Sequence, residues 1–167
     1  MNTKRLTTMA MLAAVCSILG YISVDLGSLK VSFESFPVLV GAILYGPADG
    51  LLIGAIGTLV SQLLKYGVSV TTPLWMLPYI VVGAVMGGAA KAKGFQPDNE
   101  EIWVWTFVCE FLALLLNTLA LVVDSKVFGY YTPLYIYGSL IPRTLIFIGK
   151  AVVFSYLLTK ITKRIGG

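Results

Sequence analysis

Six apolar segments fill most of this 167-residue chain, and they constrain its fold more than any other feature of the sequence. A helix needs about 20 mostly apolar residues to cross a bilayer. We expect helices over residues 6–24, 34–44, 48–64, 73–90, 102–123 and 137–159, the second being short and therefore tilted or broken. The sequence predicts an all-α integral membrane protein with six transmembrane helices, built as a single domain over residues 1–167.

The composition agrees with a membrane protein. Apolar residues make up 57% of the chain, charged residues only 12%, and the mean hydropathy is +0.88. The charged share is about half that of an ordinary soluble domain. A soluble protein of this size could not bury so much apolar surface, because much of its surface must face water.

The distribution of basic residues predicts the orientation of the chain. An even number of spans places both termini on one side of the membrane, and Lys and Arg concentrate in cytoplasmic loops. One side would carry seven basic residues: Lys4, Arg5, Lys91, Lys93, Lys160, Lys163 and Arg164. The other would carry Lys30, Lys65 and Lys126. We therefore predict cytoplasmic termini and three outer loops, over residues 25–33, 65–72 and 124–136.

Several classes of function are excluded by missing residues. The chain has no histidine, and its two cysteines, Cys16 and Cys109, lie apart in apolar segments. A zinc site or a histidine-dependent catalytic set is therefore not expected. The chain also lacks the Gly-x-x-x-x-Gly-Lys-Ser/Thr loop that binds ATP phosphates. We expect no enzyme activity, no cofactor, no metal and no nucleic-acid partner, and any ATP hydrolysis should occur on separate subunits.

Charged residues inside the apolar segments are candidates for function, because a charge near the bilayer centre is costly. Glu110, Asn117 and Asp124 recur every seven residues and form one polar stripe on a helix. Arg143 and Lys150 share a face of the last helix. This helix should run antiparallel to the helix that carries the polar stripe. Glu110 and Lys150 could form a structural ion pair or a functional one. We expect Arg143, near the outer end, to bind ligand through its planar guanidinium.

Other candidate substrate-binding residues are expected near the outer side of the membrane, at the depth of Arg143. Trp75, Tyr79 and Phe36 are aromatic residues that could cover a flat organic ligand, although each could also belong to the interfacial aromatic belt. Lys30 and Glu34, near the first outer loop, could add polar contacts. The predicted substrate-binding residues are Arg143, Asn117, Trp75, Tyr79, Lys30, Glu34 and Phe36.

Small residues mark close helix contacts. Glycines recur every four residues at Gly46, Gly50 and Gly54, and again at Gly83 and Gly87. We expect most of these grooves to serve packing within the chain. Ala10 and Ala14 on the first helix could serve internal packing or the docking of another membrane subunit.

Several short motifs accompany the six helices and the basic ends of the chain. They are Ala10-x-x-x-Ala14, the stretch 30–37 (KVSFESFP), the stretch 44–47 (LYGP) with Gly50-x-x-x-Gly54, and the end from Pro142-Arg143 to Leu158. In these features the chain resembles a known family, the substrate-binding S components of energy-coupling factor (ECF) vitamin transporters. The folate-type branch is the most similar. The resemblance implies high-affinity binding of a B-type vitamin, folate or cobalamin first, with pantothenate and pyrimidine-type vitamins left open.

The resemblance also implies a mechanism and partners. An S component of an ECF-type ABC importer binds its vitamin in the outer half of the prokaryotic plasma membrane. It docks through its first helix onto a transmembrane scaffold subunit, and two ATPase subunits drive release of the vitamin inside. Ala10 and Ala14 match the docking motif, and Arg143 matches the basic position that opens the sixth helix.

One alternative from another class stays open. The chain could be a self-sufficient small transporter or channel that works as a homo-oligomer, with the polar stripe lining a continuous path. Co-purification distinguishes the two, because only an S component should retain a scaffold and two ATPases.

Overall fold

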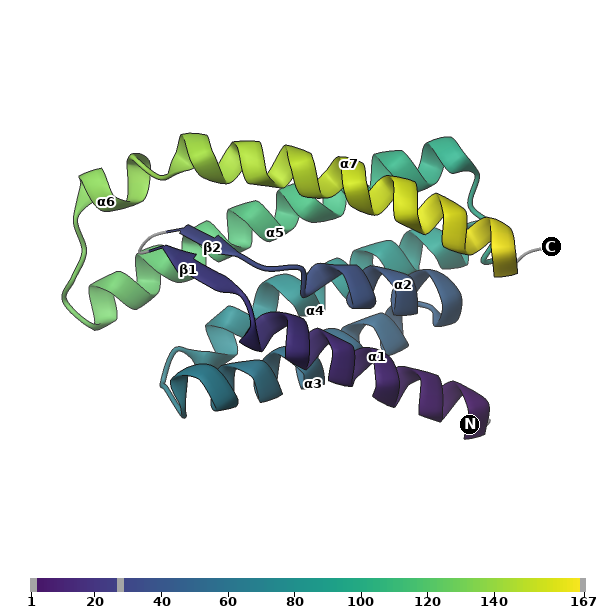
Figure 1. The fold of residues 1–167 in the computed structure, drawn as a ribbon, viewed down its shortest axis with the longest axis horizontal. Coiled ribbons are helices and arrows are strands. Elements are labelled where there is room, and N and C mark those ends of the chain that lie inside the picture. The colour runs from purple at the N-terminus through teal and green to yellow at the C-terminus, as the bar shows by residue number, and fades with distance from the viewer. Residues whose placement is uncertain (1–2, 27–28, 166–167) are drawn as a thin grey trace.

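The computed structural model describes residues 3–26 and 29–165 and places them in a bundle of helices (Figure 1). In chain order the elements are α1 (Thr3–Tyr21), β1 (Val24–Leu26), β2 (Leu29–Val31), α2 (Ser35–Tyr45), α3 (Pro47–Tyr66), α4 (Thr72–Ala92), α5 (Asn99–Val127), α6 (Pro133–Tyr137) and α7 (Leu140–Ile165). Six of these helices correspond to the six apolar segments.

Among the described residues, four helices are long and apolar enough to cross a membrane by length and composition, namely α3, α4, α5 and α7. The helix α2 is a shorter apolar helix of 11 residues, as expected. The helix α1 begins with a polar turn, Thr3-Lys4-Arg5, and is not among the four. The molecule is thus a helical membrane protein.

Local sequence signals explain where the helices begin and end. Gly46, at φ +99°, separates α2 from α3, and Pro47 occupies the first turn of α3, where a missing N–H costs nothing. A capping box joins Asp98 and Glu101 at the start of α5. This cap begins the helix three residues before the expected position, and the helix also runs four residues further at its end. Asp124 therefore belongs to α5 and not to a loop.

Two expectations about the outer loops need correction. The first helix ends at Tyr21 and not at residue 24, because the chain turns into an antiparallel hairpin in which Val24 pairs with Val31 and Asp25 with Lys30. The fold is therefore helical, as predicted, with one small hairpin in the first outer loop. The last helix begins at Leu140 and not at residue 137, because Pro133 starts a separate five-residue helix, α6.

Glycines bring α3 and α4 into backbone contact. A Cβ on Gly83 would lie 2.3 Å from the carbonyl carbon of Gly50, and one on Gly87 would lie 2.3 Å from the nitrogen of Pro47. A Cβ on Gly54 would lie 2.6 Å from the carbonyl oxygen of Tyr79. Only glycine allows two helices to approach this closely. The expected use of these grooves for internal packing is confirmed.

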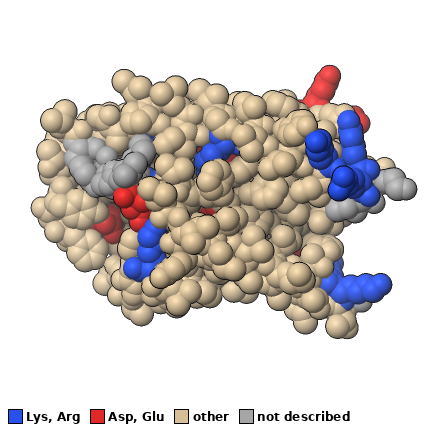
Figure 2. All heavy atoms as spheres, viewed as in Figure 1, with Lys and Arg blue, Asp and Glu red and all other residues tan. Residues whose placement is uncertain are grey.

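The helices form two groups around a shared core. The helices α1 to α4 pack against one another, α5 packs on α4, and α7 packs chiefly on α5. Phe154 of α7 also reaches the first group, with its ring centroid 5.2 Å from that of Phe36 and 6.0 Å from that of Phe33. The described ends of the chain lie at the same end of the bundle (Figure 1), where basic side chains also gather (Figure 2).

Candidate functional site

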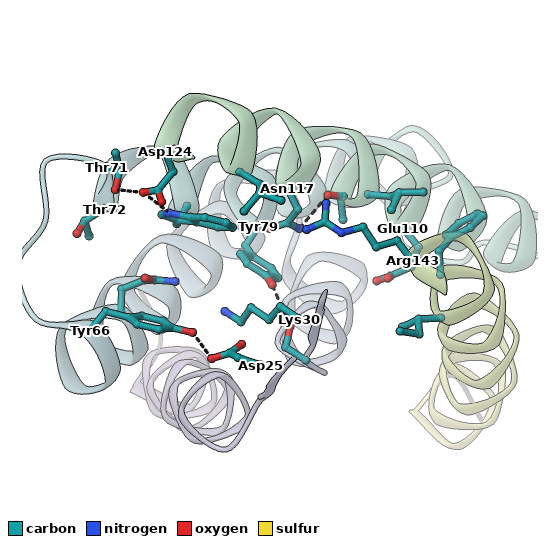
Figure 3. Close-up of a pocket in the computed structure, with 18 of the residues that line it drawn as sticks. Asp25, Lys30, Tyr66, Thr71, Thr72, Tyr79, Glu110, Asn117, Asp124 and Arg143 are labelled. Atoms are coloured by element: carbon teal, nitrogen blue, oxygen red, sulfur yellow. Dashed lines mark hydrogen bonds between the residues drawn. The ribbon is translucent and has the colours of Figure 1, made fainter. Parts of the chain in front are cut away.

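A cavity of about 420 Å³ lies between the two helix groups, within the range of pockets that hold drug-sized ligands. Its walls come from the hairpin, α3, α4, α5, α7 and the outer loops. Asp124 and Thr71 lie at one end, and Glu110 lies towards the other (Figure 3). Along α5, the 14 residues from Glu110 to Asp124 span about 21 Å. The cavity is therefore elongated along the helix axes.

At the outer end, Asp124 joins three donors from different segments. Its Oδ1 accepts hydrogen bonds from Thr71 Oγ1 at 2.5 Å and from Trp75 Nε1 at 3.3 Å. Its Oδ2 accepts one from the hydroxyl of Tyr130. This carboxylate fixes the indole of Trp75 at the cavity wall and connects the segment before α4 with the loop after α5.

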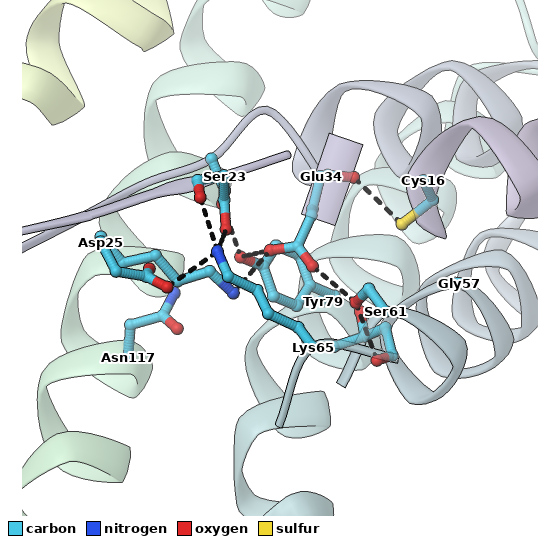
Figure 4. A network of polar contacts seen from close by, with 12 residues as sticks. Cys16, Ser23, Asp25, Glu34, Gly57, Ser61, Lys65, Tyr79 and Asn117 are labelled. Atoms are coloured by element: carbon cyan, nitrogen blue, oxygen red, sulfur yellow. Dashed lines mark hydrogen bonds and ion pairs between the residues drawn. The ribbon is translucent and has the colours of Figure 1, made fainter. Parts of the chain in front are cut away.

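A second outer cluster anchors the hairpin to the end of α3. Lys65 Nζ lies 2.7 Å from Asp25 Oδ2 and donates to the backbone oxygen of Ser23 at 2.5 Å (Figure 4). The hydroxyl of Tyr66 donates to the same Asp25 oxygen. Asp25 and Tyr66 both line the cavity. The hairpin is thus held against α3 at the mouth of the cavity.

Behind the wall lies a buried carboxylate, Glu34, whose side chain is fully buried. It accepts hydrogen bonds from Tyr79 Oη at 2.7 Å and from Ser61 Oγ at 3.0 Å, and Lys30 Nζ lies 3.1 Å from its Oε2 (Figure 4). The Tyr79 hydroxyl also lies 3.1 Å from Ser32 Oγ. Glu34 therefore orients Lys30 and Tyr79, which do line the cavity.

The middle and inner parts of the cavity carry the charges of α5 and α7. Arg143 donates from a terminal nitrogen to Thr118 Oγ1 at 3.1 Å, and Asn117 donates to the Ala113 carbonyl oxygen at 2.8 Å. Deeper, Lys150 Nζ lies 3.0 Å from Glu110 Oε2. The Glu110–Lys150 ion pair expected from helix phase is present.

Of the seven predicted substrate-binding residues, five line the cavity: Arg143, Asn117, Trp75, Tyr79 and Lys30. Two do not. Glu34 lies one layer behind, where it holds two of the five. Phe36 packs against Phe154 beside the apolar core. Phe36 was predicted to bind ligand because it lies close to the first outer loop in the sequence. Its position on α2 instead turns its side chain towards the apolar core.

Sequence reasoning missed several lining residues. Gln62 lies in the middle of an apolar helix, and Asp124 was assigned to the polar stripe without a role because its helix was expected to end before it. The polar residues of the segment 69–72 form the rim through hydrogen bonds such as Thr71 to Asp124, which no sequence spacing reveals. Within residues 3–26 and 29–165, no three metal-binding side chains of His, Cys, Asp or Glu converge.

Known proteins share this architecture. A solved structure described as FolT bound with folic acid matches with a TM-score of 0.71 at 22% identity, covering 95% of this chain and 94% of that one. A solved S component for biotin from an ECF-type ABC transporter matches with a TM-score of 0.70 at 16% identity, covering 99% and 94%. At these identities the likeness establishes the fold. No curated protein sequence matches the chain significantly.

The family model for the ECF transporter substrate-specific component matches residues 4–165, which is nearly the whole chain. The fold shared with the two structural relatives agrees with that match. The chain belongs to the family of substrate-specific S components of ECF transporters.

Proposed function

We propose that this protein is the high-affinity vitamin-binding subunit of an ECF-type ABC importer and that its ligand is folate or a close relative. The observation that carries the proposal is the elongated cavity of about 420 Å³, which carries aromatic side chains and both signs of charge in a chain of this family. Such a cavity suits a ligand with a flat ring at one end and charged groups elsewhere.

The dimensions of the cavity favour folate over cobalamin. A cavity lined along about 21 Å of α5 suits an extended molecule such as folate, whereas biotin would fill only part of it. Cobalamin is far bulkier than either and would require the helix groups to separate. The structural relative bound to folic acid supports the same choice.

We infer six membrane crossings with cytoplasmic termini in a prokaryotic plasma membrane. Both described ends lie at one end of the bundle, together with basic side chains, which is the arrangement that the positive-inside rule favours for the cytoplasmic face (Figures 1 and 2). The cavity rim at Asp124 and Tyr66 then faces the exterior, from which the vitamin enters.

Delivery of the vitamin requires partners, namely a transmembrane scaffold and two ATPases. Ala10 and Ala14 lie on the exposed face of α1, whereas Ala13 is buried. At these two positions only a methyl group projects, which allows close approach of a partner helix in lipid. The exposure of Ala10 and Ala14 supports docking over packing within this chain.

The experiment that tests the function combines binding with transport. Purified protein in detergent should retain a small molecule identifiable by mass spectrometry and should bind folic acid in calorimetry. Vesicles that contain this protein alone should bind the ligand without accumulating it, whereas vesicles with the full complex and ATP should accumulate it. Concentrative uptake by the pure subunit would refute the proposal.

The self-sufficient channel is the weaker candidate. Past the Glu110–Lys150 pair, the helices continue with fully buried apolar side chains, including Ile102 and Leu158, which favour a closed cavity floor over a continuous path. Co-purification of a scaffold and two ATPases tests the choice directly.

A further inference from the structure

The deep end of the cavity holds a buried acceptor, an oxygen of Glu110, that has no hydrogen-bond partner among the described residues. Glu110 is 2% exposed, and its Oε2 lies 3.0 Å from Lys150 Nζ. Its other oxygen, Oε1, is buried and has no hydrogen-bond partner among the described residues. Buried carboxylate oxygens are normally satisfied, because an unmade hydrogen bond in the interior is costly. Glu110 is also one of the residues that line the cavity.

The neighbouring lysine adds a donor to this acceptor. Lys150 also lines the cavity, and its ammonium carries three N–H donors. Within the described residues its ammonium contacts Glu110 Oε2 and lies 5.5 Å from the centroid of the Phe154 ring. The cavity floor thus presents a carboxylate acceptor and an ammonium donor side by side.

We propose that the Glu110–Lys150 pair recognises the cis-amide edge of a ring in the vitamin. In a cyclic amide the N–H and the C=O point to the same side, so adjacent acceptor and donor groups can engage both. An open-chain amide is trans, and its N–H and C=O point in opposite directions. Glu110 accepts the hydrogen bond from the ring N–H, and Lys150 donates one to the ring carbonyl.

This inference rests on the proposed function and specifies the chemistry of the ligand and its orientation. The ring enters first and lies at the inner end, and the rest of the molecule extends past Asn117 and Arg143 towards the rim. Folic acid carries such an edge on its pterin ring and biotin carries one on its ureido ring, whereas pantothenate carries only an open-chain amide.

The first experiment compares these three vitamins by calorimetry with the purified wild-type protein. We expect folic acid to bind, and binding of biotin in its place would refute the choice of folate while supporting the recognition of a cyclic amide. Binding of pantothenate alone would overturn the inference and leave the vitamin-binding function intact. Binding of none of the three would contradict both.

The second experiment separates recognition from structural pairing. The variant Glu110→Leu with Lys150→Met replaces a buried ion pair by apolar side chains of similar size, a change that is often neutral for stability. We expect an unchanged melting temperature and at least a tenfold loss of folic acid affinity, which corresponds to 1.4 kcal/mol or more. Wild-type affinity in the folded variant would show that the pair is only structural.

The charge-swapped variant Glu110→Lys with Lys150→Glu provides an independent measurement. It keeps an ion pair but exchanges the positions of acceptor and donor. We expect folic acid affinity to remain at least tenfold weaker, whereas full restoration of binding would overturn the inference. The matched control is Lys93→Met with Glu101→Gln. It removes the 2.5 Å ion pair at the N-terminal end of α5, while Gln can still cap the helix. This control should bind as the wild type does.

Discussion

Replacing Gly83 by alanine should destabilise the protein through the α3–α4 contact. The added Cβ would lie 2.3 Å from the carbonyl carbon and 2.4 Å from the carbonyl oxygen of Gly50. Carbon atoms in good contact are about 3.5–4 Å apart, so the two helices must separate by about 1 Å. Both contacting atoms belong to a helix backbone and cannot move aside alone. The cost of such overpacking is about 3 kcal/mol, and the higher helix propensity of alanine offsets about 1 kcal/mol.

The net loss of about 2 kcal/mol corresponds to a fall in melting temperature of about 4–8 °C for a chain of this size. A thermal unfolding series in detergent measures it. Gly88→Ala, on the same helix, is the matched control, because a Cβ there would meet no atom of the described residues within 4 Å. It should raise the melting temperature by about 2–4 °C. Equal shifts in the two variants would refute the steric reasoning.

Three further predictions concern ligand binding, stability and the docking of a partner. Arg143→Ala should weaken folic acid binding by about 1.5–3 kcal/mol, the worth of a hydrogen bond to a charged group, and unchanged affinity in calorimetry would remove this residue from the site. Tyr79→Phe should lower stability by about 1.5–3 kcal/mol because Glu34 loses a buried hydrogen bond, with thermal unfolding as the measurement and an unchanged midpoint as the contrary result. Ala10→Trp with Ala14→Trp should leave affinity unchanged while abolishing uptake and scaffold co-purification, and loss of folded protein would indicate internal packing instead.

The helices were predictable because hydropathy and helix phase are local properties. The short apolar segment 34–44 predicted α2 to within one residue at each end, and the seven-residue spacing of Glu110, Asn117 and Asp124 placed all three on the cavity wall. Because the last helix runs antiparallel to α5, the sequence also predicted that Lys150 would meet Glu110 in an ion pair. These inferences needed only the geometry of a regular helix.

What the sequence did not reveal depends on contacts between distant segments. Phe36 and Tyr79 were equally aromatic candidates, yet only Tyr79 lines the cavity, because tertiary packing decides which helix face turns inward. The hairpin was hidden in a loop whose strands have only three residues each. Glu34 was predicted to bind ligand because it is charged. It lies behind the cavity wall instead, where it accepts a hydrogen bond from Ser61 on α3, and no regular spacing in the sequence connects these two residues.

The cavity lies between two helix groups, α1 to α4 on one side and α5 with α7 on the other. Residues of α5 and α7 that contact a ligand are therefore distinct from the residues that hold α3 against α4. The α3–α4 contact rests on backbone atoms and glycines, and it lies in the group that α7 meets only through a few side chains such as Phe154. Substitutions on the cavity faces of α5 and α7 therefore alter what the protein recognises without loosening that contact. The cavity faces of α5 and α7 can thus change on a constant α3–α4 frame, and design could alter specificity from these two helices while Lys30, Trp75 and Tyr79 stay in place.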